Sequence, residues 1–291
     1  MNEAGFPKRL FDRIDELERL RYPDDGSLAV HAGSILAVAD AAAAPFTVSH
    51  YAVRHLDFAI DHLTAIRALI VNADILPTYA AFTLLRAAVE NLGSAMWLIS
   101  GKDATERVLR ALQAQYRDAM DFQKSDALLE PHFPELTRSD GIGERLDQVR
   151  AVAGRNNLSM VKVKKKDPWN QIVRSLGFDD KTADMAEYLW KSCSACAHGD
   201  EWTYTLMDFE ELPGSTVGIV RLKIAPPPAM LASMLSLTLT MAEHVLDLYD
   251  SLRLPVAGPL TSLSPRRASL ARAADEVTTT QVPAGSAEVK S

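Results

Sequence analysis

The chain contains little of the chemistry that most often marks an enzyme or a secreted protein. Its 291 residues include only two cysteines, so no disulfide framework can form. It has no Gly-rich phosphate loop, no H-E-x-x-H and no G-x-S-x-G pattern. The first 22 residues are charged and amphipathic, and they lack the apolar core and small-residue cleavage site of a signal peptide. We therefore expect a cytoplasmic protein with no cofactor.

An excess of positive charge is also missing. Lys and Arg total 31 against 38 Asp and Glu, which gives a formal net charge of −7. Proteins that bind nucleic acid depend on basic surfaces, so the overall charge does not favour a nucleic-acid partner. Apolar residues make up 47% of the chain, which is enough for a substantial core.

No apolar run is long enough and free enough of charged residues to predict a membrane span. The nearest is Ile75–Ser100, whose only charged residues, Arg86 and Glu90, both fall near its middle. A charge at the centre of a bilayer costs about 2.5–3.5 kcal/mol. Pro77 and Asn91 weaken the pattern further. We therefore predict a buried central helix here and no membrane partner.

Helical periodicity, capping residues and Pro or Gly breaks divide most of the chain into helices. The predicted helices are 7–22, 27–44, 47–73, 77–100, 104–129, 139–154, a short one from Pro168-Trp169, 180–198 and 228–253. Alternating β-branched and aromatic residues at 202–209 and 217–224, around Pro213-Gly214-Ser215, predict a β-hairpin. The expected fold is mainly α, a bundle of about seven to nine helices with one small β-hairpin near the C-terminal end. Residues 1–255 form a single helical domain in this prediction, and 256–291 a disordered tail.

The predicted central helix carries a polar stripe opposite its apolar face. Arg86, Glu90, Gly93 and Trp97 fall on this stripe, and the other faces hold mostly small or apolar residues. Buried charges must be paired, and residues at i and i+4 can meet. One interpretation is a structural Arg86–Glu90 ion pair. The other is a recognition or catalytic pair lining a pocket, with Gly93 making room and Trp97 forming a wall.

The helix predicted over 180–198 ends in a second polar group. Ser194 and His198 lie one turn apart, with Lys191 beside them. A histidine in the last turn interacts favourably with the helix dipole, and Gly199 is a typical residue after a helix end, so a structural role explains both. The functional interpretation is a histidine, oriented by Ser194, that meets Arg86 and Glu90 across a helix–helix groove.

Other polar patterns favour structural roles. Cys193 and Cys196 are spaced CxxC, but they lie on the apolar face near a helix end, which predicts buried structural cysteines. His55, His62 and the neighbouring Asp57 and Asp61 could ligate a metal, but a surface face is the more common arrangement, and we predict no metal site. The basic run 162–166 predicts an exposed loop or edge segment; it could touch phosphate, although such runs are usually only solvated.

Three short motifs together resemble a family of uncharacterised helical proteins found widely in actinobacteria. They are Arg86-Ala-Ala-Val-Glu90 with Trp97 following, Glu106-Arg107-Val108-Leu109-Arg110, and Ser194-Ala-Cys-Ala-His198-Gly199 with Trp202 close behind. The resemblance spans about residues 50–250. It implies a helical fold and a set of candidate residues, and no established activity comes with it.

The chain is also distantly similar to HEPN-like helical domains, some of which are RNases in toxin–antitoxin and defence systems. Their catalytic pattern places an Arg four to six residues before a His on one helix. Here those positions hold Ser194, Cys193 and Ser192. Arg86 would therefore have to approach His198 from another helix.

Two functional hypotheses follow. The first is a non-catalytic helical interaction or ligand-binding protein that self-associates, as the missing catalytic motifs and apolar helices suggest. The second is a HEPN-like RNase or other hydrolase, and only this one implies a nucleic-acid partner. Its catalytic candidates are Arg86, Glu90, Ser194 and His198, and its substrate-binding candidates are Trp97, Lys191 and Trp202. It requires His198 to lie within about 6 Å of Arg86 and Glu90, the span of one water-bridged hydrogen bond.

Overall fold

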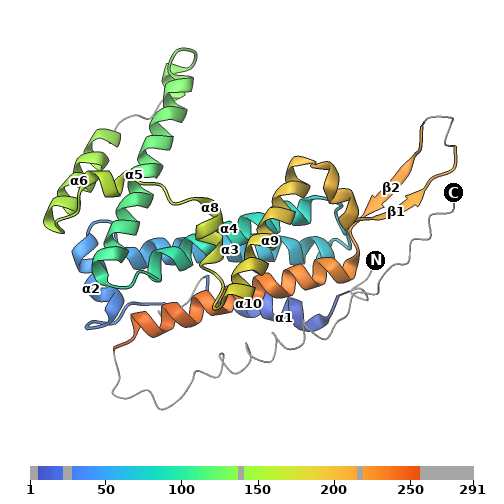
Figure 1. Cartoon of the computed structure of the whole chain (residues 1–291), viewed down its shortest axis with the longest axis horizontal. Helices are drawn as coiled ribbons and strands as arrows, with labels where there is room; N and C mark the ends of the chain where they lie inside the picture. Colours follow the sequence, from blue (N-terminus) through green and yellow to red (C-terminus); the bar gives the residue numbers. More distant parts are fainter. Residues whose placement is uncertain (1–5, 22–27, 137–140, 215–218, 256–291) are drawn as a thin grey trace.

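The computed structural model describes residues 6–21, 28–136, 141–214 and 219–255. Within these ranges it is mainly helical, with one small antiparallel sheet near the C-terminal end, as predicted (Figure 1). The longer helices are α1 (Lys8–Glu18), α2 (Ile35–Ala43), α3 (Val48–Arg67), α4 (Ala80–Ile99), α5 (Ala104–Leu129), α6 (Ile142–Arg155), α9 (Asp180–His198) and α10 (Pro228–Arg253). Shorter elements are η2 (Ala68–Asn72), η3 (Pro134–Leu136), α7 (Met160–Val163), α8 (Trp169–Arg174), η4 (Glu201–Leu206) and the strands β1 (Asp208–Glu211) and β2 (Leu222–Ala225).

Helix α4 is the centre of the bundle. It packs against α3, α5, α8, α9 and α10, and most of its side chains are buried. This agrees with the predicted central helix, because a helix with so little polar surface needs protein on nearly every side. Gly93 allows a close approach of α8, since a Cβ atom there would lie 3.3 Å from the carbonyl oxygen of Ile172.

Helix bounds agree best with the prediction where a capping group fixes them. The side chain of Asp103 accepts a hydrogen bond from the Glu106 amide at 2.8 Å, and α5 starts at the next residue. Asp179 and Thr182 form a capping box at the start of α9, and Gly199 ends that helix with a left-handed φ of 76°. Helix α10 has the predicted bounds and begins at the last of three consecutive prolines, Pro228.

Helix α2 is shorter than predicted. The prediction ran from residue 27, but Ser27 lies outside the described residues and the helix begins at Ile35. Gly33, with a φ of 78°, breaks the helical path, and Ser34 then caps the helix by accepting a hydrogen bond from the Ala37 amide at 3.1 Å. The run 162–166 also differs from a simple loop, because its start belongs to the short helix α7.

The first predicted strand of the hairpin is wrong over most of its length. Residues 201–206 form the 3₁₀ helix η4, and the strand β1 starts only at Asp208. The carbonyl oxygen of Asp200 accepts a 2.6 Å hydrogen bond from the Thr203 hydroxyl, and Thr203 is buried. This capping interaction makes a turn where alternation alone predicted an extended chain.

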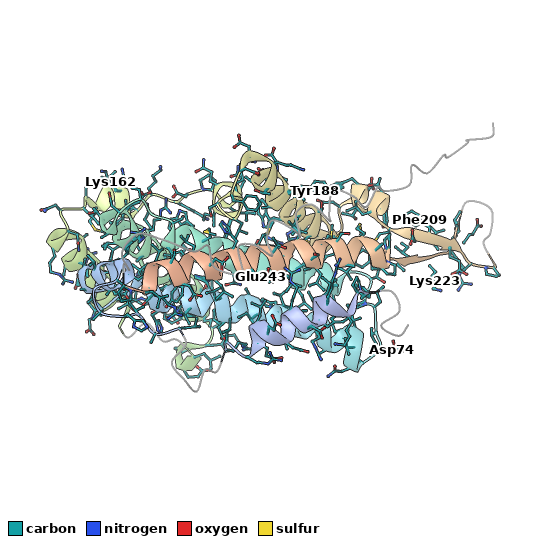
Figure 2. The ribbon with its side chains drawn as sticks, turned by 90° about the horizontal axis from the view of Figure 1, so that it is seen from below. Asp74, Lys162, Tyr188, Phe209, Lys223 and Glu243 are labelled. Atoms are coloured by element: carbon teal, nitrogen blue, oxygen red, sulfur yellow. The ribbon has the colours of Figure 1, made fainter. Side chains whose placement is uncertain are left out.

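Helix α10 is long and apolar enough to cross a membrane by length and composition alone. More than half of its apolar stretch is buried inside the protein, as expected for a core helix. It runs along the bundle beside α1, and the two helices are joined by an ion pair between Arg13 and Glu243 at 2.7 Å (Figure 2). The predicted tail 256–291 lies outside the described residues.

Candidate functional site

The C-terminal end of α9 meets the middle of α4 through a direct side-chain contact. Arg86 Nη1 lies 2.9 Å from His198 Nε2. A guanidinium only donates, so Nε2 accepts this hydrogen bond, and the proton of the neutral ring then sits on Nδ1. The Arg86–His198 approach that the composite-site hypothesis requires is therefore present. His198 is exposed at its position one residue before the helix-ending Gly199.

Glu90 lies at the centre of the cluster, between two donors. Its Oε1 atom accepts from Arg86 Nε at 2.9 Å and from Trp190 Nε1 at 2.9 Å. The Arg86 and Glu90 side chains are 27% and 25% exposed, so both charges are largely removed from water. We call Arg86, Glu90, Trp190 and His198 the α4–α9 clamp. It ties the central helix to α9 at two points.

Trp190 was missed as a member of this group by sequence reasoning. Its position placed it with the apolar face of α9, and its ring is indeed partly buried. The signal was the indole N–H, because a buried tryptophan needs an acceptor and Glu90 is a carboxylate on the facing helix. Local spacing could not show this pairing, since the two residues are 100 positions apart.

Two of the other candidates on α9 do not join the clamp. Among the described residues no hydrogen bond links Ser194 to His198, so the serine does not orient the ring. Lys191 forms an ion pair with Glu187 one turn earlier, at 2.8 Å. Trp202 lies on η4 and is 44% exposed.

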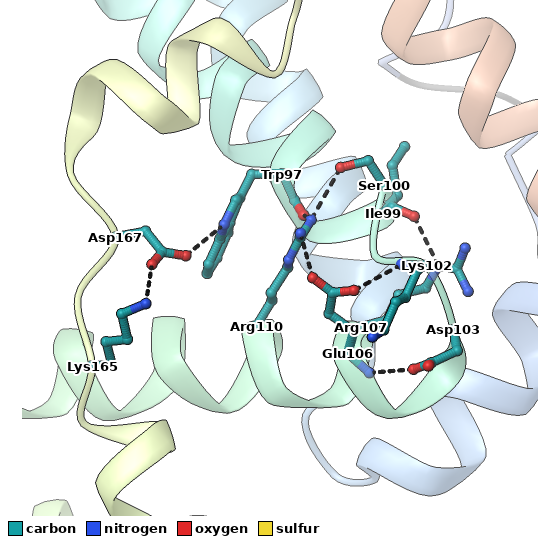
Figure 3. A network of polar contacts seen from close by, with 10 residues as sticks. All are labelled: Trp97, Ile99, Ser100, Lys102, Asp103, Glu106, Arg107, Arg110, Lys165 and Asp167. Atoms are coloured by element: carbon teal, nitrogen blue, oxygen red, sulfur yellow. Dashed lines mark hydrogen bonds and ion pairs between the residues drawn. The ribbon is translucent and has the colours of Figure 1, made fainter.

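Trp97 belongs to a different polar network at the far end of α4 (Figure 3). Its indole Nε1 donates to Asp167 Oδ2 at 3.1 Å, and the Arg110 guanidinium lies 5.5 Å from its ring centroid. Arg110 also binds Glu106 at 2.7 Å and donates to the carbonyl oxygen of Trp97. The space beside Gly93 is taken by α8. Neither residue therefore shapes a pocket around Arg86.

The two carboxylates considered as metal ligands, Asp57 and Asp61, instead bind an arginine. Arg21 donates to Asp57 at 2.7 Å and to Asp61 at 2.9 Å. His55 instead contacts Asn91 Oδ1 at 2.8 Å, and burial lowers the pKa of its imidazole. In the ranges that the structure describes, no group of three or more His, Cys, Asp or Glu side chains is placed to hold a metal ion.

Both cysteines are free and buried, as predicted. Burial raises the pKa of the Cys196 thiol to about 11 and that of the Cys193 thiol further still. Only the thiolate is nucleophilic, so neither side chain is suited to redox or covalent chemistry in the folded protein.

We expect native protein at pH 8 to react with a disulfide reagent such as Ellman's reagent at least about a hundredfold more slowly than an exposed cysteine. The reason is the small thiolate fraction, together with steric protection. The measurement is the absorbance time course in buffer, and unfolded protein in guanidinium is the control, in which both thiols should react within minutes. Rapid labelling of the native protein would contradict the buried positions.

Comparisons of the chain with protein-family models, curated proteins and solved structures gave no match.

Proposed function

We propose that this chain is a non-catalytic helical interaction protein that associates with a second copy of itself through the β1–β2 ribbon. The observation that carries this proposal is the exposure of two large apolar side chains, Phe209 and Leu222, on one face of the ribbon. In Figure 1 the two strands extend away from the helical bundle, and Figure 2 shows Phe209 and Lys223 on this extension. A two-stranded ribbon alone is only marginally stable in water. Here Ile224 packs against the core while Phe209 and Leu222 stay exposed, so a further surface would stabilise the ribbon.

The register of the ribbon separates its two faces. Phe209 pairs with Ile224 and Glu211 with Leu222, so these four side chains share one face. Phe209 is 50% exposed and Leu222 46% exposed. The other face carries the pair Glu210–Lys223, whose charged atoms lie 3.1 Å apart.

A second copy is the occupant that this geometry favours. This face holds three apolar side chains and Glu211, and a twofold axis would bring Phe209 and Leu222 of one ribbon against those of another. Each strand also has one edge that no other described strand pairs with, and such edges favour strand addition. Exposed Trp202 and Tyr204 lie on the adjacent η4, and aromatic residues of this kind are enriched in interfaces.

We expect wild-type protein to sediment as a dimer, and the Phe209→Ser/Leu222→Ser variant to weaken dimerisation by at least about a hundredfold. Burying one large apolar side chain is worth about 1.5–3 kcal/mol, and both sites are lost twice in a symmetric dimer. Analytical ultracentrifugation across a range of concentrations measures this.

The matched control changes the polar face of the same ribbon. Glu210→Ser/Lys223→Ser should leave the dimer intact, because these side chains face away from the proposed contact. A wild-type protein that stays monomeric at all concentrations, or a control that dissociates as readily as the apolar variant, would refute the proposal.

A second candidate function is RNA cleavage, which the 2.9 Å contact between Arg86 and His198 favours. In this alternative His198 acts as acid or base and Arg86 stabilises anionic charge. One feature weighs against it: the Nε2 lone pair that a base would use already accepts a hydrogen bond from Arg86. RNA cleavage by wild type and by His198→Ala distinguishes the two functions. Loss of cleavage in the variant would support the nuclease, whereas equal activity, or none in either, would exclude it.

A further inference from the structure

A groove of about 370 Å³ lies between α5 and the segment that follows α7. Its lining is strongly basic. Five cationic side chains and one carboxylate contribute to it: Arg117, Lys124, Lys164, Lys165, Lys166 and Asp121. This charge is local, because the chain as a whole has a formal net charge of −7. A cleft lined by charges of one sign concentrates the field and attracts ligands of the opposite sign.

The basic segment 164–166 is anchored at both of its ends. Before it, Gln113 donates a hydrogen bond to the carbonyl oxygen of Lys162 at 3.0 Å, and Val163 is buried against the core. After it, Asp167 accepts a hydrogen bond from Trp97 and lies 3.7 Å from Lys165 (Figure 3). The lysines are therefore presented by an anchored segment, unlike a freely solvated loop.

Arg117 is the most informative residue of the lining. It is partly buried, and among the described residues it forms no hydrogen bond or ion pair. Burial lowers the pKa of its guanidinium by more than the nearby carboxylates of Asp121, Asp167 and Asp118 raise it. Two other partly buried arginines are paired, Arg13 with Glu243 and Arg110 with Glu106, both at 2.7 Å. Arg54 is partly buried as well, and its guanidinium lies over the Tyr51 ring at 4.8 Å.

The carboxylates near Arg117 are engaged elsewhere. Asp118 binds Arg145 at 2.7 Å, and Asp121 lies 3.4 Å from Lys124. Lys166 also has no ion pair or hydrogen bond within the described ranges, and Lys164 lies over the Tyr116 ring at 5.8 Å. Within the described ranges the groove thus holds three cations that form no ion pair, Arg117, Lys164 and Lys166, whereas Lys124 and Lys165 each have a carboxylate partner.

We propose that this groove binds a small ligand that carries two or more linked phosphate groups. Several separate cations match several separate anionic oxygens, and lysine and arginine are the side chains that proteins use for phosphate. The volume suits a small molecule, since ligand pockets span about 300–1,000 Å³. Arg117, at the helix side of the groove, would receive one phosphate, and Lys164 and Lys166 the other. This site is separate from the β1–β2 ribbon and does not depend on the proposed self-association.

Titration calorimetry with inorganic pyrophosphate on the full chain tests the proposal. We expect saturable binding of one pyrophosphate per chain, with a Kd below about 1 mM at low salt. Lys166→Glu should weaken binding at least tenfold, and the milder Lys164→Gln should weaken it in the same direction. Lys181→Glu is the matched control, because it makes the same charge change on the exposed surface of α9, outside the groove lining, and it should change the Kd by less than twofold.

The source of the phosphates is distinguished by parallel titrations. Tripolyphosphate and ATP bound equally well would indicate recognition of the phosphate chain alone, and tighter binding of ATP would indicate a nucleotide. Absence of pyrophosphate binding by wild type would overturn the proposal. So would equal weakening by Lys181→Glu, which indicates only non-specific attraction, or a short single-stranded RNA that binds more than tenfold tighter than tripolyphosphate, which indicates a nucleic-acid surface.

Discussion

Replacing Gly177 with alanine is expected to destabilise the fold by about 3 kcal/mol or more. Gly177 lies where the chain turns from α8 into α9. A Cβ atom at this position would lie 2.2 Å from the backbone nitrogen of Ala183 and 2.5 Å from its Cα. Both are backbone atoms of a capped helix, so no side-chain rotation can relieve the overlap. The turn itself must move, and this disturbs the packing of α9, the helix that carries Trp190 and His198.

The same substitution at Gly154 should have the opposite effect on folding stability. Gly154 lies inside α6, and no atom comes within 4 Å of a Cβ built there. Alanine in a helix is favoured over glycine by about 0.5–1 kcal/mol, so Gly154→Ala should stabilise the protein slightly. Urea denaturation of both variants, followed by circular dichroism, measures the two changes. A Gly177→Ala variant as stable as wild type would show that this turn is not packed as described.

Helices whose ends are set by nearby residues were predictable from the sequence. Asp103, Asp179 and Gly199 each determine a boundary through contacts within a few residues, and the start of α5 and both ends of α9 follow from them. Two features were missed although they also depend only on nearby residues. Gly33 and the Asp200–Thr203 contact each select a turn that competes with the periodic pattern around it.

The candidate site was predictable only in part, because its contacts join distant segments. Arg86 and Glu90 lie one helical turn apart, so their pairing could be predicted from their spacing. His198 could be predicted as a candidate because it lies at the polar end of α9. Trp190 and the true surroundings of Trp97 depend on which helix faces which. The basic groove depends on this as well: the run 162–166 is visible in the sequence, but the α5 face that includes Arg117 becomes its partner only in the fold.

Replacing Glu90 with leucine is expected to cost about 2 kcal/mol of folding free energy. The change leaves the Arg86 charge and the Trp190 N–H without their acceptor, and hydrogen bonds to a charged group contribute about 1.5–3 kcal/mol. The expected loss stays in the lower part of that range because about a quarter of each charged side chain still contacts water. Asp147→Asn is the control, since Asp147 and its partner Arg150 are 72% and 59% exposed, and less than about 0.5 kcal/mol should be lost there.

The double variant Arg86→Met/Glu90→Leu should be more stable than the sum of the two single changes predicts. Each single change leaves one partly buried charge unpaired, whereas the double change removes both, so a coupling energy of about 1–2 kcal/mol is expected. The free energies of unfolding of the wild type, both single variants and the double variant, measured with denaturant, give this coupling energy as a double-mutant cycle. If the double variant keeps its stability and still dimerises, the clamp holds α4 and α9 together without serving the association. Strictly additive losses would instead show that Arg86 and Glu90 do not act as a pair, and the clamp would be wrong.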